Sequence, residues 1–158
     1  MGSWTNFFIA EVGATAALSG LVIVAISINL ARILAFPELP GRAAEAIVTL
    51  AGSLVLCSVV LIPQPLRVLG GELLIVAFFM WFVPALVHIR TWRKFDRKRA
   101  NIHWRAVLSH ITSLPSIIGS VLLLFDNIDG LYWISAGVIF ALINGMVSTW
   151  VLLVEILR

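Results

Sequence analysis

Five apolar stretches fill most of this 158-residue sequence and restrict the folds open to it. A helix of about 20 apolar residues crosses the roughly 30 Å hydrocarbon core of a bilayer. Each stretch is near that length, so the sequence predicts an all-α integral membrane protein, a bundle of five transmembrane helices in one transmembrane domain that covers residues 1–158. The expected helices cover about residues 6–30, 43–62, 69–89, 104–125 and 131–157.

The composition excludes a soluble domain. Hydrophobic residues make up 61% of the chain and charged residues 12%, and the mean hydropathy is +1.06, whereas soluble domains are about half apolar. The formal charge of +3 could suit a nucleic-acid binder, but the basic residues gather in one loop instead of along a face. We therefore expect the lipid bilayer, and no nucleic acid, as a partner.

Prolines and turn residues mark the breaks between these stretches. Proline cannot continue a helix, so residues 36–41 and 62–65 are expected connections. Residues 126–130 have a turn-rich composition and predict a tight antiparallel pair of helices. Residues 70–72 leave three alternatives open, a loop, a helix start or a re-entrant bend.

The basic residues predict the orientation, because short loops rich in lysine and arginine stay in the cytoplasm. The segment 90–103 is strongly basic, which places it inside, the amino terminus outside and the carboxyl terminus in the cytoplasm. The expected location is the plasma membrane or a bacterial inner membrane, with multiple spans. The basic loop could also bind anionic lipid, although topological anchoring is the simpler explanation.

A polar stripe follows the first helix, and we predict it to be the functional face. Polar groups within hydrocarbon are costly unless they meet a partner or water. The opposite face of this helix is small-residue rich, with Gly13, Ala17, Gly20 and Val24, which suits close helix packing. A structural alternative places Glu11 in the headgroup region or pairs it with Arg67. The stripe consists of Glu11, Thr15, Ser19, Val22, Ile26, Asn29 and Arg32.

Secondary polar candidates lie on the fourth and fifth helices. A serine row with a neighbouring histidine follows the fourth helix, and an amide and a hydroxyl lie deep in the fifth. Either row could line water or form a packing seam between helices. A weaker row in the second helix contains Thr49, Ser53 and Cys57. The secondary candidates are Ser109, His110, Ser113, Ser116, Ser120, Asn144 and Ser148.

The sequence carries no catalytic signature. It lacks a G-x-S-x-G elbow, an H-E-x-x-H motif and a glycine-rich phosphate loop. His88, His103 and His110 would need to converge to hold a haem or metal, and interfacial anchoring is the simpler interpretation of each. We therefore expect no enzyme, no cofactor, no metal site and no catalytic residues.

Two functions remain open, and the sequence favours the first of them over the second. The first is a homo-oligomeric, cation-favouring ion channel, in which copies of the first helix line a pathway for an inorganic ion and Glu11 forms a carboxylate ring. The second is a non-catalytic assembly or regulatory subunit whose polar stripes are satisfied inside its own bundle. The two differ in whether Glu11, Thr15 and Ser19 face a shared hydrated axis or the same chain.

Overall fold

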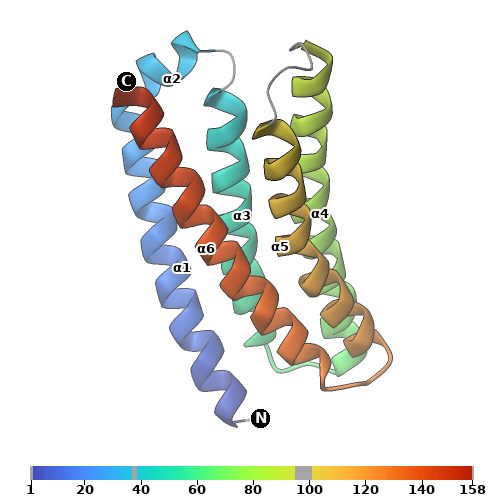
Figure 1. Ribbon diagram of the computed structural model, residues 1–158. Coiled ribbons are helices and arrows are strands. Elements are labelled where there is room, and N and C mark those ends of the chain that lie inside the picture. Colours follow the sequence, from blue (N-terminus) through green and yellow to red (C-terminus); the bar gives the residue numbers. More distant parts are fainter. Residues whose placement is uncertain (1, 37–38, 95–100, 158) are drawn as a thin grey trace.

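We describe the protein from a computed structural model. It describes the backbone of residues 2–36, 39–94 and 101–157 and the side chains of 4–36, 39–89, 110–150 and 154. These residues form helices and no strand, which confirms the all-helical prediction for this part of the chain (Figure 1). The helices are α1 (Gly2–Ile28), α2 (Leu30–Ala35), α3 (Leu39–Val60), α4 (Leu66–Lys94), α5 (Asn101–Leu124) and α6 (Gly130–Leu157).

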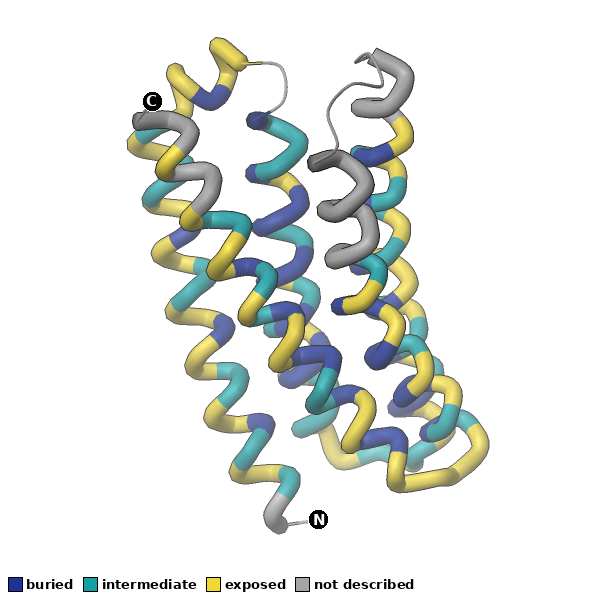
Figure 2. Tube along the Cα trace, viewed as in Figure 1, coloured by how far each residue is buried: buried dark blue, intermediate teal, exposed yellow. Residues whose placement is uncertain are grey.

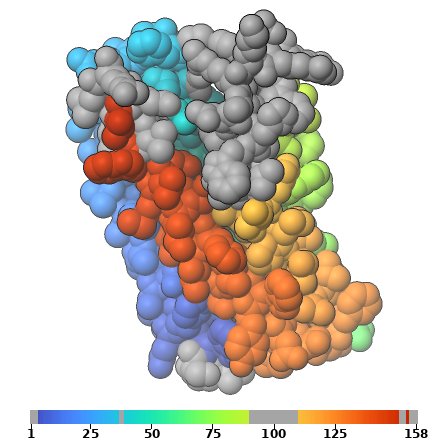
Figure 3. Space-filling model, in the orientation of Figure 1, coloured from blue at the N-terminus to red at the C-terminus, as the bar shows by residue number. Residues whose placement is uncertain are grey.

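The long helices run alternately up and down, and the two ends of the chain lie at opposite ends of the bundle (Figure 1). The α4 helix packs on α5 and α3, and α6 packs on α5, α3 and, over a smaller area, α1. The α1 helix rests mainly on α3. On the face drawn in Figure 3, α6 lies between α1 and α5.

The outer faces of the bundle are apolar. Large hydrophobic side chains such as Leu21, Ile28 and Trp150 are exposed, and exposed positions follow the outer sides of the helices (Figure 2). An aqueous protein rarely exposes so large an apolar surface, so these faces suit lipid. Four described helices are long and apolar enough to cross a bilayer, Trp4–Ile28, Leu39–Val60, Leu66–Ile89 and Gly130–Trp150, with a shorter apolar helix at His110–Leu124.

The fold is therefore that of a multi-pass helical membrane protein. The described part of α5 that is apolar covers fewer residues than a full span, so five crossings stay a prediction. The orientation stays a prediction as well. Arg32 lies in α2 and Arg42 in α3 at the end of the bundle that also carries the end of α6 (Figure 1), which is the grouping that the positive-inside argument uses.

Helix boundaries differ from the expected ones where proline or asparagine lies near an end. The α1 helix ends at Ile28, before a turn at Asn29, and α2 follows. The expected connection at residues 36–41 is wrong for residues 39–41, which form the first turn of α3. Pro40 is tolerated there because its missing N–H has no helical partner to lose. Residues 70–72 are inside α4, which begins earlier at Leu66, so all three alternatives for these residues, a loop, a helix start and a re-entrant bend, are wrong.

The turn between α5 and α6 is confirmed. Asp126 takes a positive φ of 59°, and the Asn127 N–H donates to the Leu122 carbonyl at 3.0 Å, which closes the end of α5. The Asn127 side chain accepts from the Asp129 N–H at 2.9 Å. Arg67 at the start of α4 pairs with Asp126 across this end, with 2.7 Å between Nε and Oδ2.

Glycines allow the helices to approach closely at this same end. A Cβ on Gly70 would lie 2.6 Å from the Leu124 backbone nitrogen, and one on Gly119 would lie 2.6 Å from the Gly130 carbonyl oxygen. Such distances exclude any side chain larger than hydrogen without a backbone shift. The main core fills the space beside these contacts with Phe8, Leu56, Cys57, Leu69, Leu73, Met80, Leu123, Leu131, Ile134, Val138 and Ala141.

Candidate functional site

The polar stripe of α1 turns inward over most of its length. Thr15 is 0% exposed and Val22 is 5% exposed. Val22 packs with Ala46 and Leu50 of α3. The stripe therefore meets the neighbouring helix of the same chain in its middle. Toward the carboxyl-terminal end, Ile26 and Asn29 are half-buried and Arg32 is exposed.

Several polar groups of this stripe are satisfied locally. The Thr15 hydroxyl donates to the Glu11 carbonyl at 2.6 Å, and the Asn29 side chain donates to the Ala25 carbonyl at 2.9 Å. Glu11 is half-buried. Its Oε2 and the Ser19 Oγ are buried and make no hydrogen bond to any described residue. Arg67 pairs with Asp126, and no contact between Arg67 and Glu11, which the structural alternative allowed, is seen among the described residues.

The opposite face of α1 points away from the bundle. Gly13, Ala17, Gly20 and Val24 are exposed. A Cβ added to Gly13 or Gly20 would meet nothing within 4 Å. The small-residue face is thus open to lipid or to another helix.

The serine row of α5 packs against α6. Ser113, Ser116 and Ser120 are buried, and the Ser120 hydroxyl donates to the Ser116 carbonyl at 2.7 Å. The Ser116 Oγ lies against Gly137, where a Cβ would collide with it. These contacts are typical of a close helix seam in lipid. The side chain of Ser109 lies outside the described residues.

The remaining secondary candidates lie on α5 and α6. The ring of His110 is half-buried and its centroid lies 5.8 Å from that of Trp81 on α4. Asn144 and Ser148, one turn apart on α6, are half-buried. Because α5 packs mainly on α4 and α6, its candidates do not join the stripe of α1.

The sequence reasoning missed a buried ionisable pair between α3 and α4. Glu45 is 5% exposed and His88 is 7% exposed. Their Oε1 and Nε2 atoms are 3.5 Å apart. An acidic residue within an apolar span is unusual because its burial is costly. Glu45 of α3 is therefore a stronger candidate for a functional carboxylate than Glu11 of α1. His88 is buried against Glu45 and is not simply an interfacial anchor.

Glu45 begins a polar row along α3. The Thr49 hydroxyl donates to the Glu45 carbonyl at 2.8 Å, and the Ser53 hydroxyl donates to the Thr49 carbonyl at 2.9 Å. All three residues are buried. The i, i+4 spacing that places these three residues on one face is visible in the sequence. The predicted row of this helix contained Thr49 and Ser53 but not Glu45.

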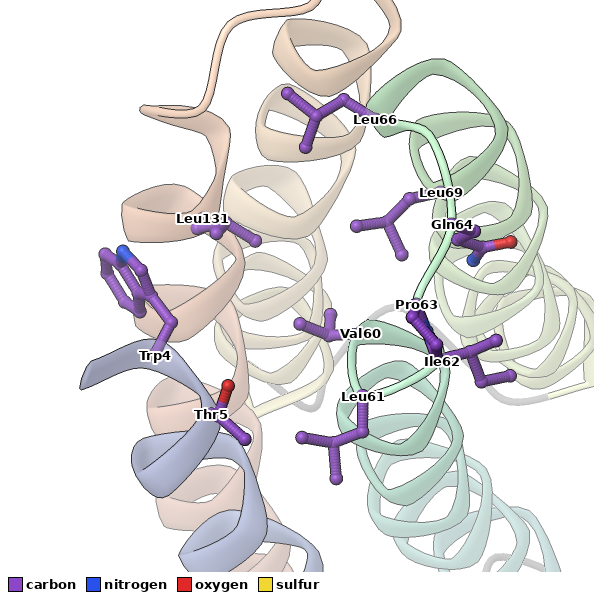
Figure 4. A pocket seen from close by; sticks show the side chains of 10 residues that line it. All are labelled: Trp4, Thr5, Val60, Leu61, Ile62, Pro63, Gln64, Leu66, Leu69 and Leu131. Carbon is purple, nitrogen blue, oxygen red and sulfur yellow. The ribbon is translucent and has the colours of Figure 1, made fainter. Parts of the chain in front are cut away.

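A cavity of about 250 Å³ lies at the amino-terminal end of the bundle (Figure 4). It is bounded by the first turns of α1, α4 and α6 and the end of α3, far along α3 and α4 from Glu45 and His88. Its lining is mostly aliphatic, so it offers little to position a charged substrate. The lining residues are Trp4, Thr5, Val60, Leu61, Ile62, Pro63, Gln64, Leu66, Leu69 and Leu131.

Metal-ligating residues do not cluster in the part of the chain that the structure describes, where no group of three or more His, Cys, Asp or Glu side chains could hold an ion. Comparison of this chain with protein-family models, with curated proteins and with solved structures finds no match. The geometry of the bundle itself is therefore what supports a function for this chain.

Proposed function

We propose that the protein is a non-catalytic membrane subunit with an assembly or regulatory role. The observation that supports this proposal most is the inward orientation of the α1 stripe, with Thr15 fully buried. A pore lined by copies of α1 would need the middle of this stripe to face a hydrated axis outside the single bundle. Instead, Val22 packs on Ala46 and Leu50 of the same chain.

The hydrogen bonds of the α1 stripe and of the polar row on α3 agree with this proposal. The Thr15, Thr49 and Ser53 hydroxyls donate to carbonyls of their own helices. Such local bonds satisfy the donors without water. Apolar side chains fill the space between α1 and α3, so the middle of the stripe faces packed side chains of the same chain and not a shared axis. An assembly or regulatory subunit would act through its surfaces and helix contacts, and it would need no water path through the bundle.

Cysteine accessibility tests this proposal directly. In a chain whose native Cys57 is replaced by alanine, we expect Thr15→Cys and Ser19→Cys to resist a membrane-impermeant thiol reagent applied to either side of proteoliposomes. Asp129→Cys lies in an exposed turn and is the matched positive control. Rapid labelling of Thr15→Cys or Ser19→Cys would contradict the proposal, because only a water path would bring the reagent to them.

The second candidate function is a homo-oligomeric, cation-favouring ion channel. One observation favours it: Glu11 Oε2 and Ser19 Oγ are buried without a hydrogen-bond partner among the described residues. Buried polar atoms of this kind often contact ordered water. A carboxylate at one end of such a water path would attract cations.

Ion flux separates the two candidate functions. For the subunit we expect proteoliposomes with the purified protein to leak cations no faster than protein-free vesicles, under a potential or a pH gradient. For the channel, flux would exceed that background and Glu11→Gln would alter it. Glu72 is an exposed carboxylate on α4, so Glu72→Gln is the matched control and would leave the flux unchanged. A flux that both variants leave unchanged would argue against a pathway along α1.

The proposed partners follow from the surfaces of the bundle. The lipid bilayer covers its apolar faces, and the open side of α1 around Gly13 and Gly20 offers a place where a second copy could approach closely. Anionic lipid at the basic segment 90–103 remains a proposal, and the side chains of this segment lie outside the described residues. We propose a cytoplasmic carboxyl terminus and a plasma or bacterial inner membrane location on the positive-inside argument.

A further inference from the structure

Glu45 and His88 face each other inside the half of the bundle that carries the end of α6. Both lie within apolar spans, Leu39–Val60 and Leu66–Ile89. Glu45 is six residues after Leu39, which places it about 9 Å along α3 at 1.5 Å per residue. The side chains are 6% and 9% exposed, so bulk water does not solvate either one.

The chemistry of this pair is that of proton exchange. A carboxylate and an imidazole each take up one proton, so the pair holds none, one or two. With one proton the pair is neutral overall, either as an ion pair or as two uncharged groups. The Glu45 Oε1 and His88 Nε2 atoms are 3.5 Å apart, and water does not screen them from each other. Protonation of one group must therefore change the proton affinity of the other.

A second observation also points to a proton as the ligand. The His88 Nε2 is buried and makes no hydrogen bond within the described residues, so this nitrogen is available at the side of the ring that faces Glu45. The described residues offer no third His, Cys, Asp or Glu that would complete a metal site here. A single small cation, the proton, fits two ligands, whereas zinc requires about four.

We propose that Glu45 and His88 together form a proton-binding site within the membrane-spanning bundle. The number of protons bound sets the charge across the α3 and α4 contact. With one proton bound, the Glu45 and His88 side chains carry no net charge, and as an ion pair they attract each other across the contact. With none or two bound, the site carries a net charge inside an apolar span. Intramembrane Glu and His pairs with this chemistry are typical of proton relays and pH-responsive switches.

Charged and titratable groups also lie on α3 and on the helices packed around the pair. Arg42 is half-buried and one turn from Glu45 on the same helix. From the elements packed on α3 and α4, the described side chains add Arg32 of α2 and His110 of α5. Glu11 of α1 and Tyr132 of α6 lie toward the opposite end of the bundle. Because Arg42 is the charged side chain nearest to Glu45 along α3, the variants used to test the pair keep Arg42 unchanged.

Infrared difference spectroscopy of the protein in lipid tests the site between about pH 4 and pH 9. In wild type we expect a protonated-carboxyl band that grows on acidification and that Glu45→Gln removes. Glu11→Gln is the matched control and should retain this band. His88→Gln should move the midpoint of the Glu45 band by about one pH unit or more, because it removes a charge partner within 4 Å.

Two outcomes would overturn the proposal: a wild-type spectrum that Glu45→Gln leaves unchanged, or a Glu45 band whose midpoint His88→Gln does not move. If either variant does not fold, nitrogen-15 NMR of His103→Gln/His110→Gln protein, in which His88 is the remaining histidine, reports the imidazole charge without altering the pair. A His88 signal that stays neutral over the whole pH range would also overturn it.

Discussion

Replacing Gly119 by alanine is expected to lower the free energy of unfolding by about 1–3 kcal/mol, the usual cost of overpacking. The added Cβ would lie 2.6 Å from the Gly130 carbonyl oxygen and 2.9 Å from the Ile134 nitrogen. Both are backbone atoms of α6, so neither can rotate away as a side-chain end could. The α5 and α6 helices must separate, and the loss of their close contact gives the predicted effect.

The measurement is a denaturation titration with SDS in detergent micelles, followed by helix content. Gly13→Ala is the matched control, because the same methyl group meets nothing within 4 Å there. Alanine is the better helix former by up to about 1 kcal/mol, so this control should be neutral or slightly stabilised. Equal destabilisation by the two variants would show that the effect comes from helix propensity or lipid contacts and not from the α5 and α6 seam.

The helical membrane fold could be predicted from the sequence because hydropathy is a local property. Each apolar stretch carries enough residues to span a bilayer whatever surrounds it. The residues at which the helices begin and end could be predicted less well. Pro40, for example, is compatible with the start of a helix as well as with a break between helices. For Gly70 the sequence left a loop, a helix start and a re-entrant bend open, but its missing side chain instead allows α4 to approach the α5 backbone.

The inward face of each helix could not be predicted in the same way. In lipid, a polar row such as Glu11, Thr15 and Ser19 avoids the hydrocarbon, but it can do so against its own chain or against a shared pore. That choice depends on which helix lies opposite, and Ala46 and Leu50 of α3 decide it for Val22. Neither residue carries a sequence signal for that role.

The Glu45 and His88 pair illustrates the same limit. Glu45 is one acidic residue at the start of an apolar span, and His88 lies beside a basic loop, so each is compatible with an interfacial position when considered alone. Their relation arises only when α3 and α4 pack side by side. The spacing of Glu45 with Thr49 and Ser53 was the one available signal, and it indicates a buried face but not the partner.

His88→Leu is expected to lower the free energy of unfolding by about 3 kcal/mol. Removing one partner of a buried polar pair costs about 1–3 kcal/mol, and more where the remaining group is charged. We expect a value near 3 kcal/mol and not above it, since Arg42 lies one turn from Glu45 and can offset part of the lost interaction. Glu45→Leu should cost less, because it removes the carboxyl group itself from the apolar span.

A double-mutant cycle at neutral pH, measured by the same SDS titration, isolates the contact between the two side chains. The Glu45→Leu/His88→Leu protein should be more stable than the sum of the single effects allows, with a coupling free energy of about 1–3 kcal/mol. Glu11→Leu combined with His88→Leu is the matched control and should be additive to within about 0.5 kcal/mol, because these residues lie toward opposite ends of the bundle. If the Glu45 and His88 cycle is additive too, the 3.5 Å approach carries no net attraction, and the cost of burying Glu45 must be met by other contacts of its carboxylate.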